Sequence, residues 1–428
     1  MKDRIAFLAF CASVIVLSTL YGTAAARRDW FPNPQITLAI DTIADLRANW
    51  KNDLALEPTR HLVAARNPGR PETFASFKMY RPDDAAPGYV LIAGLSIEQS
   101  RSFFDVVLYD AEGRVLHEWP VDYSILDPEG LKPLNVMLHG MEVFEDGSLA
   151  VTFDAGNVIA RIDACGQPMW TTAGEFHHSI SSDGQGGIWA WRNEDIVRLD
   201  AETGQEIHEI SLRDDVMQAA GGQQGILSIR SYIDADGAPL RYDWDAFHAN
   251  DVEPLSTEMA DAFPQFEAGD LLISLRELNL VAVIARETGR LIWWQHGPWL
   301  KQHDPDFRPD GTITVYDNAS GLGISRILRI NPTSREVETV FAGSEAVPFY
   351  SWQRGKHQML PNGNVLITES ERGRVFEAAP DGNLVWEHER VWDADNNVVV
   401  TEARHLDPGF FRNGAPSCMV TADIGKGA

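Results

Sequence analysis

The hydrophobic residues of this 428-residue chain follow two patterns. The first is a single apolar stretch over residues 5–26, close to the N-terminus. The second runs from about residue 76 to the C-terminus, where short apolar or β-branched runs alternate with Asp-Gly, Asn-Gly and similar turn signals. Short β-rich runs between such turns are typical of stacked antiparallel hairpins. We therefore expect an all-β domain that follows one N-terminal helix.

The N-terminal stretch is about long enough to cross a bilayer as a helix. Lys2 and Arg4 precede it, and it ends in small residues, as a cleavable signal peptide does. We expect residues 1–26 to be a signal anchor, with a cleaved signal peptide as the alternative. Both alternatives export the remainder, which predicts a periplasmic or other extracytoplasmic protein anchored to the inner membrane by this helix.

Residues 27–75 form a polar lead-in between the apolar stretch and the β-rich region. Four apolar residues recur there at helical spacing and predict a short amphipathic helix: Ile40, Ile43, Leu46 and Trp50.

A turn unit recurs through residues 76–428. It usually combines an acidic residue or Asn, a glycine and a large apolar residue, and its copies lie at 110–119, 163–170, 200–210, 286–294, 331–341 and 380–388. Repeats spaced like these copies, with about four short strands each, are typical of propeller blades. The six copies therefore predict a six-bladed β-propeller. The long gap between the third and fourth copies predicts an insertion over about residues 211–262.

Histidines recur at a fixed place in these units. His139, His178, His303 and His357 each stand six to eight residues before a hairpin glycine. This spacing puts each at the start of a blade's innermost strand, so we expect the four imidazoles at one mouth of the central channel. A structural hydrogen-bonding role is the alternative for each. His177 is expected to point to the opposite strand face from His178.

Charge and cysteine content restrict the partners. A net charge of −26 argues against nucleic acid, and it requires that any anion site be a local cluster of Arg and His. The three cysteines lack metal-ligand spacing, so we expect neither a structural zinc site nor a disulfide framework. One bridge between Cys165 and Cys418 remains an open alternative.

Several segments together carry a family resemblance. The most specific are a Trp-x-x-x-His-x-Asn motif, a Gln-His-Asp motif followed by Tyr-Asp-Asn, and a Ser-Arg pair, which occupy 244–250, 302–318 and 325–326. Other matching segments are GDLLISLRELN, GRLIWWQHG and HQMLPNGNVLITES. Over residues 80–400 the chain resembles the exported bacterial arylsulfotransferases, which do not use a nucleotide sulfate donor.

The resemblance implies a funnel-like site at the propeller axis and ping-pong transfer of a sulfuryl group from an aryl sulfate to a phenol through a sulfated histidine. It carries over His248, His303, Arg326 and His357 as catalytic residues, with His357 as the best candidate nucleophile and His303 or His248 as alternatives. His139 and His178 fit a substrate-binding role. Arg329, Arg354 and Arg374 compete with Arg326.

We expect neither a cofactor nor a metal. A sulfate monoester carries a single negative charge, so the transfer does not require a metal. Asp304, Asp317 and Asn318 lack the spacing of a calcium loop. No Walker loop, GxSxG or Rossmann fingerprint occurs in the sequence.

Two other functions remain open. One is a non-catalytic propeller that scaffolds or binds a partner in the cell envelope, although a scaffold has no use for inward histidines. The other is a quinone-cofactor dehydrogenase propeller, a class that usually has more blades and carries adjacent cysteines, which this chain lacks.

Overall fold

The computed structural model describes residues 2–28, 30–97, 103–218, 231–233, 239–242 and 245–418. The chain divides into two compact units, Met1–Arg60 and His61–Ala428. The first contains α1 (Lys2–Arg28) and α2 (Asn33–Asp53), and α2 covers the segment where the apolar spacing predicts a helix. Within the described part of the chain, α1 is the one helix long and apolar enough to span a membrane, with a mean hydropathy of 2.1.

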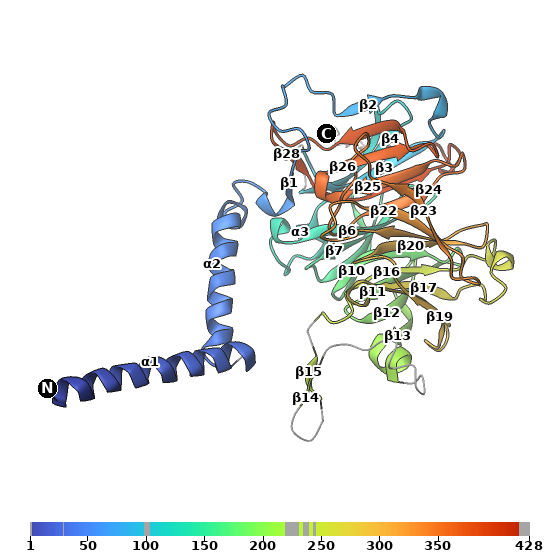
Figure 1. The fold of residues 1–428 in the computed structure, drawn as a ribbon. Helices are drawn as coiled ribbons and strands as arrows, with labels where there is room; N and C mark the ends of the chain where they lie inside the picture. Colours follow the sequence, from blue (N-terminus) through green and yellow to red (C-terminus); the bar gives the residue numbers. More distant parts are fainter. Residues whose placement is uncertain are drawn as a thin grey trace, which may run out of the picture. The chain divides into compact units, whose positions relative to one another are not determined.

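The second unit is a six-bladed β-propeller, as the repeat predicted (Figure 1). Each blade is an antiparallel sheet whose strands follow one another outward from the axis. The first three blades consist of β29 (Val400–Leu406), β3 (Tyr89–Leu95), β4 (Phe104–Asp110) and β5 (Val115–Val121); β6 (Met137–Val143), β7 (Leu149–Asp154), β8 (Val158–Ile162) and β9 (Pro168–Ala173); and β10 (Phe176–Ser182), β11 (Gly187–Arg192), β12 (Asp195–Asp200) and β13 (Glu206–Ser211).

The last three blades repeat this order. They consist of β16 (Ala249–Pro254), β17 (Leu271–Leu275), β18 (Leu280–Ile284) and β19 (Leu291–His296); β20 (His303–Phe307), β21 (Ile313–Asp317), β22 (Arg326–Ile330) and β23 (Val337–Ala342); and β24 (Lys356–Met359), β25 (Val365–Glu369), β26 (Arg374–Ala378) and β27 (Leu384–Glu389), with β2 (Phe77–Met79) added outside β27.

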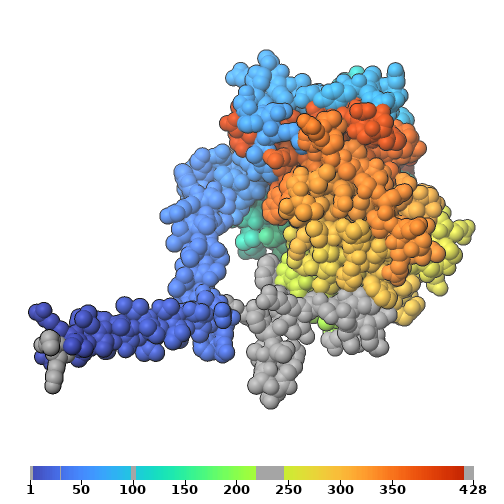
Figure 2. Space-filling model, in the orientation of Figure 1, coloured from blue at the N-terminus to red at the C-terminus, as the bar shows by residue number. Residues whose placement is uncertain are grey.

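The two ends of the propeller chain lie side by side. The late strand β29 is the innermost strand of the blade whose other strands are β3, β4 and β5. The early strands β1 (Leu62–Ala64) and β2 pair with β28 (Asn396–Val398) and β27. In Figure 2 the light-blue early segment accordingly lies against the orange and red surface of the late strands. The late strand β29 thus covers the inner edge of β3 and closes the ring.

The recurring turn units join the third and fourth strands of every blade, and their tryptophans explain why the unit repeats. The indole of Trp119 donates to the carbonyl of Gly147 in the next blade, at 2.8 Å. Trp170 donates to Ala201 and Trp293 to Pro332 in the same way, each at 2.9 Å. Each of these indoles therefore packs apolar surface between blades and satisfies its N–H across the same interface.

The connection between the third and fourth blades runs from the end of β13 at Ser211 to Ala249, so the insertion expected over residues 211–262 extends too far. After β13 the chain forms η4 (Leu212–Gln218) and the pair β14 (Ser231–Ile233) and β15 (Pro239–Tyr242). Part of the expected segment lies outside the described residues. Innermost strand β16 already begins at Ala249, so the connection ends there.

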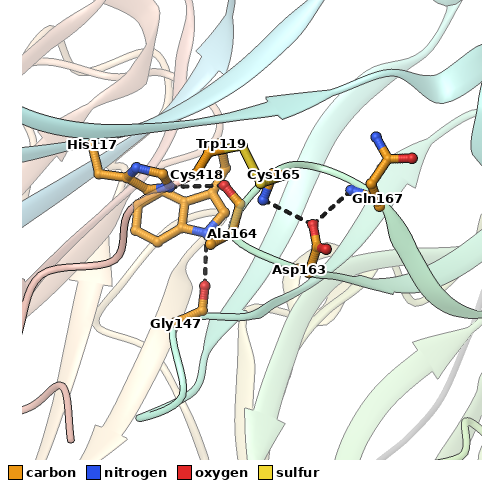
Figure 3. The surroundings of a disulfide bond; sticks show 8 residues. All are labelled: His117, Trp119, Gly147, Asp163, Ala164, Cys165, Gln167 and Cys418. Carbon is orange, nitrogen blue, oxygen red and sulfur yellow. Dashed lines mark hydrogen bonds between the residues drawn. A yellow bond between two sulfur atoms is a disulfide. The ribbon is translucent and has the colours of Figure 1, made fainter. Parts of the chain in front are cut away.

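A disulfide joins Cys165 to Cys418, which realises the one bridge that the sequence left open (Figure 3). Cys165 lies in the turn between β8 and β9, where its backbone N–H and that of Gln167 donate to the carboxylate of Asp163. Beside it, the His117 ring nitrogen lies 2.9 Å from the carbonyl oxygen of Ala164. The bridge thus fixes the segment that follows β29 to the second blade.

Candidate functional site

Histidines from successive innermost strands meet near the propeller axis. The ring centroids of His139 and His178 are 4.3 Å apart, and those of His178 and His248 are 5.1 Å apart. His139 belongs to β6 and His178 to β10, whereas His248 directly precedes β16. We refer to these three residues, with His177 and His303, as the histidine cluster.

Irregular strand geometry aims these side chains. The pairing register shifts beside His139, His178 and His303, which marks a β-bulge in each strand. His178 and His248 have φ angles of 60° and 46°, in the left-handed region that non-glycine residues seldom adopt. The bulges turn the chain so that imidazoles from separate blades face one another.

The prediction that His177 points away from His178 is wrong. Their Nδ1 atoms lie 2.7 Å apart, so one ring donates and the other accepts. The alternation of side chains along a strand holds only while the pairing stays regular, and the register shifts between His177 and Ile180. The bulge therefore adds His177 to the cluster.

Burial keeps most of these imidazoles neutral. It lowers the pKa of His139 to about 3 and that of His177 below its ordinary value. Burial, together with the neighbouring imidazoles, lowers the pKa of His178 well below 6.5. Burial also lowers the pKa of His303 well below 6.5, against the opposing effect of its bond to Asn318. Neutral imidazoles offer nitrogen lone pairs, which serve as nucleophiles or as metal ligands.

The hydrogen bonds of His303 determine which of its nitrogens carries the proton. Its Nδ1 lies 2.7 Å from the Oδ1 of Asn318. The amide nitrogen of Asn318 donates to the carbonyls of Ser351 and Arg354, at 2.8 and 2.7 Å. Since carbonyls only accept, Oδ1 must be the atom that faces His303, and Nδ1 must donate to it. The lone pair of His303 is therefore on Nε2.

Two arginines lie near the cluster. Arg276 donates its backbone N–H to the carbonyl of His248, at 3.1 Å, and its positive charge is among the causes that lower the pKa of His303. A guanidinium nitrogen of Arg354 lies 4.0 Å from the carboxylate of Asp154, which itself lies 3.9 Å from His139. Sequence reasoning named Arg354 as a competitor but missed Arg276, although its segment GDLLISLRELN carries part of the resemblance.

Arg326 lies elsewhere. It begins β22, the third strand outward from the axis, and its guanidinium donates to the buried carboxylate of Asp317 and to the carbonyl of Pro298. Asp317 is its direct partner across the sheet. No contact joins Arg326 to an imidazole within the part of the chain that the structure describes.

A second polar region lies further along the same innermost strands. It is a cavity of about 420 Å³, which we call the acidic cavity. Six carboxylates and three basic side chains line it: Glu142, Asp251, Glu253, Asp304, Asp306 and Glu402, with Arg308, Lys356 and Arg404. Because these residues follow the histidines in chain order, the cluster and the cavity lie toward opposite ends of the channel.

The carboxylates of this cavity differ in pKa. Burial raises the pKa of Asp251 to about 6 and that of Glu253 to about 8, and burial beside Asp304 raises the pKa of Asp306 well above its ordinary value. Burial opposes the ionisation of Asp304 too, but the charge of Lys356 and hydrogen bonds from His357 outweigh it and lower the pKa of Asp304. Asp304 is thus the firmly ionised carboxylate of the cavity.

His357 lines the acidic cavity. Its backbone N–H and its Nδ1 both donate to Oδ2 of Asp304, at 2.5 and 2.9 Å, so the neutral ring has its lone pair on Nε2. The expectation that all four repeated histidines share one mouth therefore fails for this residue. The reason is local: β24 pairs with β25 without a register shift, so no bulge turns His357 toward the cluster.

Two groups of side chains have the geometry of metal ligands. The donor atoms of His139, Asp154 and His178 all lie within 4.8 Å of one another, and so do those of Asp304, Asp306 and His357. The first group belongs to the histidine cluster and the second to the acidic cavity.

Six blades around an axis with imidazoles toward one end and carboxylates toward the other define a β-propeller protein with an axial polar site. The family model described as "Arylsulfotransferase (ASST)" matches residues 140–391, more than half of the chain. The chain therefore belongs to the arylsulfotransferase family, which confirms the resemblance found in the sequence and supports arylsulfotransferase activity in general terms.

Comparison with curated proteins gives no match. Among solved structures, the chain is similar to a protein of unknown function from Bacteroides caccae, at 12% identity, with a TM-score of 0.45 over 74% of this chain and 98% of the other. It is also similar to a streptogramin B lyase, at 14% identity, with a TM-score of 0.42 over 74% and 88%. At TM-scores below 0.5 these likenesses carry no argument about this chain.

Proposed function

We propose that this protein transfers a sulfuryl group from a phenolic sulfate ester to a phenolic acceptor, through a sulfated His303. The observation that carries the proposal is the neutral imidazole of His303, whose Nδ1 is held by Asn318 and whose Nε2 bears the lone pair. A neutral imidazole nitrogen is a competent nucleophile near neutral pH.

Charge favours His303 over His357 as the nucleophile. The donor is an anion, and carboxylates outnumber basic side chains by six to three around His357. Around His303 the charge of Arg276 is close enough to lower the pKa of the imidazole, although the carboxylates of Asp154 and Asp245 also border the cluster. An anionic sulfate ester is attracted to the second environment and repelled by the first. His357, which the family resemblance suggested first, is therefore the alternative that the experiments must test.

The reaction has two steps. In the first, Nε2 of His303 bonds to the sulfur as the bond from sulfur to the aryl oxygen breaks, and the phenolate leaves. Positive charge that develops on the ring is stabilised through Nδ1–H, which donates to Asn318. In the second, the acceptor phenol loses its proton, its oxygen bonds to the sulfur, and the bond from Nε2 to sulfur breaks. The enzyme returns to its starting state.

His248 suits the proton transfers of both steps. Its Nδ1 is hydrogen-bonded to the carboxylate of Asp245, which fixes the orientation of the ring. As a general acid it would protonate the leaving phenolate, and as a general base it would then accept the proton of the acceptor phenol. His139 and His178 would contact the bound ester as neighbours in the same cluster.

Arg276 is the best candidate to stabilise the sulfuryl oxygens. Transfer of a sulfuryl group resembles phosphoryl transfer, in which positioned positive donors offset charge on the equatorial oxygens. Arg354 is a second candidate near the cluster. Arg326 remains a prediction from the resemblance, but its bonds to Asp317 favour a structural role.

We propose further that the propeller acts outside the cytoplasm, held by α1 as a membrane anchor. Two features support this: a single apolar helix near the N-terminus, and a disulfide between Cys165 and Cys418. Structural disulfides persist in exported proteins and are rare in the reducing cytosol.

Release of a coloured nitrophenol from its sulfate ester tests the activity. We expect release that depends on an added phenol acceptor, as ping-pong transfer requires. Arg276→Ala should lower the rate by roughly 10²–10³-fold, the loss typical of one transition-state donor, whereas Arg326→Ala should retain most of the rate. Absence of release with every phenol tried would favour a non-catalytic role, and equal losses in the two variants would refute the assignment of Arg276.

A further inference from the structure

The acidic cavity contains an imidazole nitrogen that the fold leaves without a partner. His357 is 5% exposed, and its buried Nε2 has no hydrogen-bond partner among the described residues. A buried polar atom without a partner costs free energy comparable to a lost hydrogen bond. Its position is nonetheless fixed, because Asp304 holds the opposite side of the ring through Nδ1.

Carboxylates stand beside this nitrogen. Oδ2 of Asp306 lies 3.6 Å from Nε2 of His357. Glu253 lies on the neighbouring innermost strand, where its carboxylate accepts the backbone N–H of Phe307, the residue after Asp306. Neither Asp306 nor Glu253 forms an ion pair with a lysine or arginine that the structure describes. The basic side chains are engaged elsewhere: Lys356 pairs with Asp251 and Asp304.

We propose that this corner of the acidic cavity is a binding site for a divalent transition-metal ion, with Nε2 of His357 and the carboxylate of Asp306 as its protein ligands. A zinc-sized ion binds such atoms at about 2.0–2.2 Å. It therefore fits between two donor atoms that lie 3.6 Å apart with little movement of either. Mixed nitrogen and oxygen ligands favour zinc or manganese over calcium, which prefers oxygen alone.

Asp304 has the role that a supporting carboxylate plays in many metal sites. A histidine ligand usually donates its other ring nitrogen to a carboxylate, which fixes the tautomer and makes the ligand more basic. The bond from His357 Nδ1 to Asp304 has this arrangement, at 2.9 Å. No local motif signals such a site, because its ligands come from two separate strands, β20 and β24. A bound ion would link the innermost strands of two consecutive blades.

Metal titration of the full chain, after removal of bound metal with a chelator, tests the proposal. Zn²⁺ and Mn²⁺ are each titrated by calorimetry, and the melting temperature is measured with and without metal. We expect binding and a higher melting temperature in the native protein. Asp306→Asn and His357→Gln should weaken binding by at least the 10–100-fold that loss of a supporting partner causes.

Two control variants distinguish the proposed ligands from the rest of the channel. Glu142→Gln removes one carboxylate from the same cavity but none of the proposed ligands, and it should bind metal nearly as the native protein does. His178→Gln disrupts the histidine cluster and should also leave this binding intact. Asp306 is partly exposed, so Asp306→Asn remains informative if His357→Gln fails to fold.

The proposal is overturned if the native protein binds neither ion, or if Asp306→Asn and His357→Gln bind as tightly as the native protein. It is equally overturned if Glu142→Gln loses as much affinity as Asp306→Asn, which would indicate general electrostatic attraction. Loss of binding in His178→Gln would assign the ion to the histidine cluster instead. None of these outcomes depends on sulfuryl transfer.

Discussion

The two ends of the propeller axis are built from the same innermost strands but have opposite chemistry. At one end, burial keeps imidazoles neutral beside Arg276 and Arg354. At the other end, six carboxylates surround the cavity that contains His357. His303 and Asp304 are adjacent in the sequence, yet the first is bonded to Asn318 and the second lines the cavity. One residue along a strand therefore separates two kinds of site.

The difference shows how a propeller can place different sites at different depths along its axis. Every blade contributes its innermost strand in the same direction, so residues at equal depth form a ring. Early positions supply imidazoles, and later positions supply Glu142, Asp251, Asp306 and Glu402. An anionic substrate and a metal cation thus each find a suitable environment in one channel, at different depths.

The largest expected effect is on catalysis. If the histidine cluster is the reacting end, His303→Ala should lower kcat/KM by roughly 10³-fold or more, as the loss of a nucleophile does. His357→Ala should lower it far less, because His357 lies among carboxylates at the other end. Nitrophenol release from the sulfate ester measures both. A larger loss of kcat/KM in His357→Ala than in His303→Ala would contradict the comparison.

A subtler change concerns the pH dependence of activity. The pKa of His303 lies well below 6.5, so the native enzyme should stay active when the pH falls below that value. Asn318→Asp replaces a neutral partner with a carboxylate, which favours the imidazolium and should move the acid limb of the pH profile upward by roughly 1–3 units. Asn250→Asp, at a buried asparagine that donates to Gln302 instead of an imidazole, serves as the control. An acid limb that stays in place in Asn318→Asp would remove the assigned role of this contact.

The smallest expected effect is on stability, and it has opposite signs at the two ends. Between pH 6.5 and about 3, the unfolded chain binds a proton at His139 that the folded chain does not, so stability falls as the pH falls. Between pH 4.5 and about 8, the folded chain holds a proton on Glu253 that the unfolded chain lacks, so stability falls as the pH rises. Each slope is at most about 1.4 kcal/mol per pH unit.

Denaturant unfolding with a chelator present can separate the two contributions. His139→Gln should flatten the loss of stability toward acid, and Glu253→Gln should flatten the loss toward alkali. Identical pH profiles for both variants and the native protein would show that neither group is buried as described.

Much of this architecture could be predicted from the sequence, because blades repeat and turn signals are local. The glycine and tryptophan units indicated the number of blades, and hairpin spacing placed His139, His178 and His303 on innermost strands. The exact face of each side chain could not be predicted. A bulge shifts a strand by one residue, and nothing in the residues around His178 or His357 distinguishes the bulged strand from the regular one.

The surroundings of the arginines could not be predicted from the sequence either. The sequence shows that Arg326 follows a serine. Its ion pair with Asp317, however, depends on the strand register that places the two residues directly opposite each other. Arg276 approaches the cluster because its backbone bonds to His248, a contact between residues far apart in the sequence. Both contacts lie within single blades, and the strand registers that form them leave no local signal.

The most direct test of the central claim is to expose the native protein to an aryl sulfate donor without acceptor and locate the covalent label by peptide mass spectrometry. The account predicts the mass of one sulfuryl group on the peptide that contains His303, and its disappearance when phenol is added. A label on the peptide that contains His357, or on a tyrosine or serine, would contradict it.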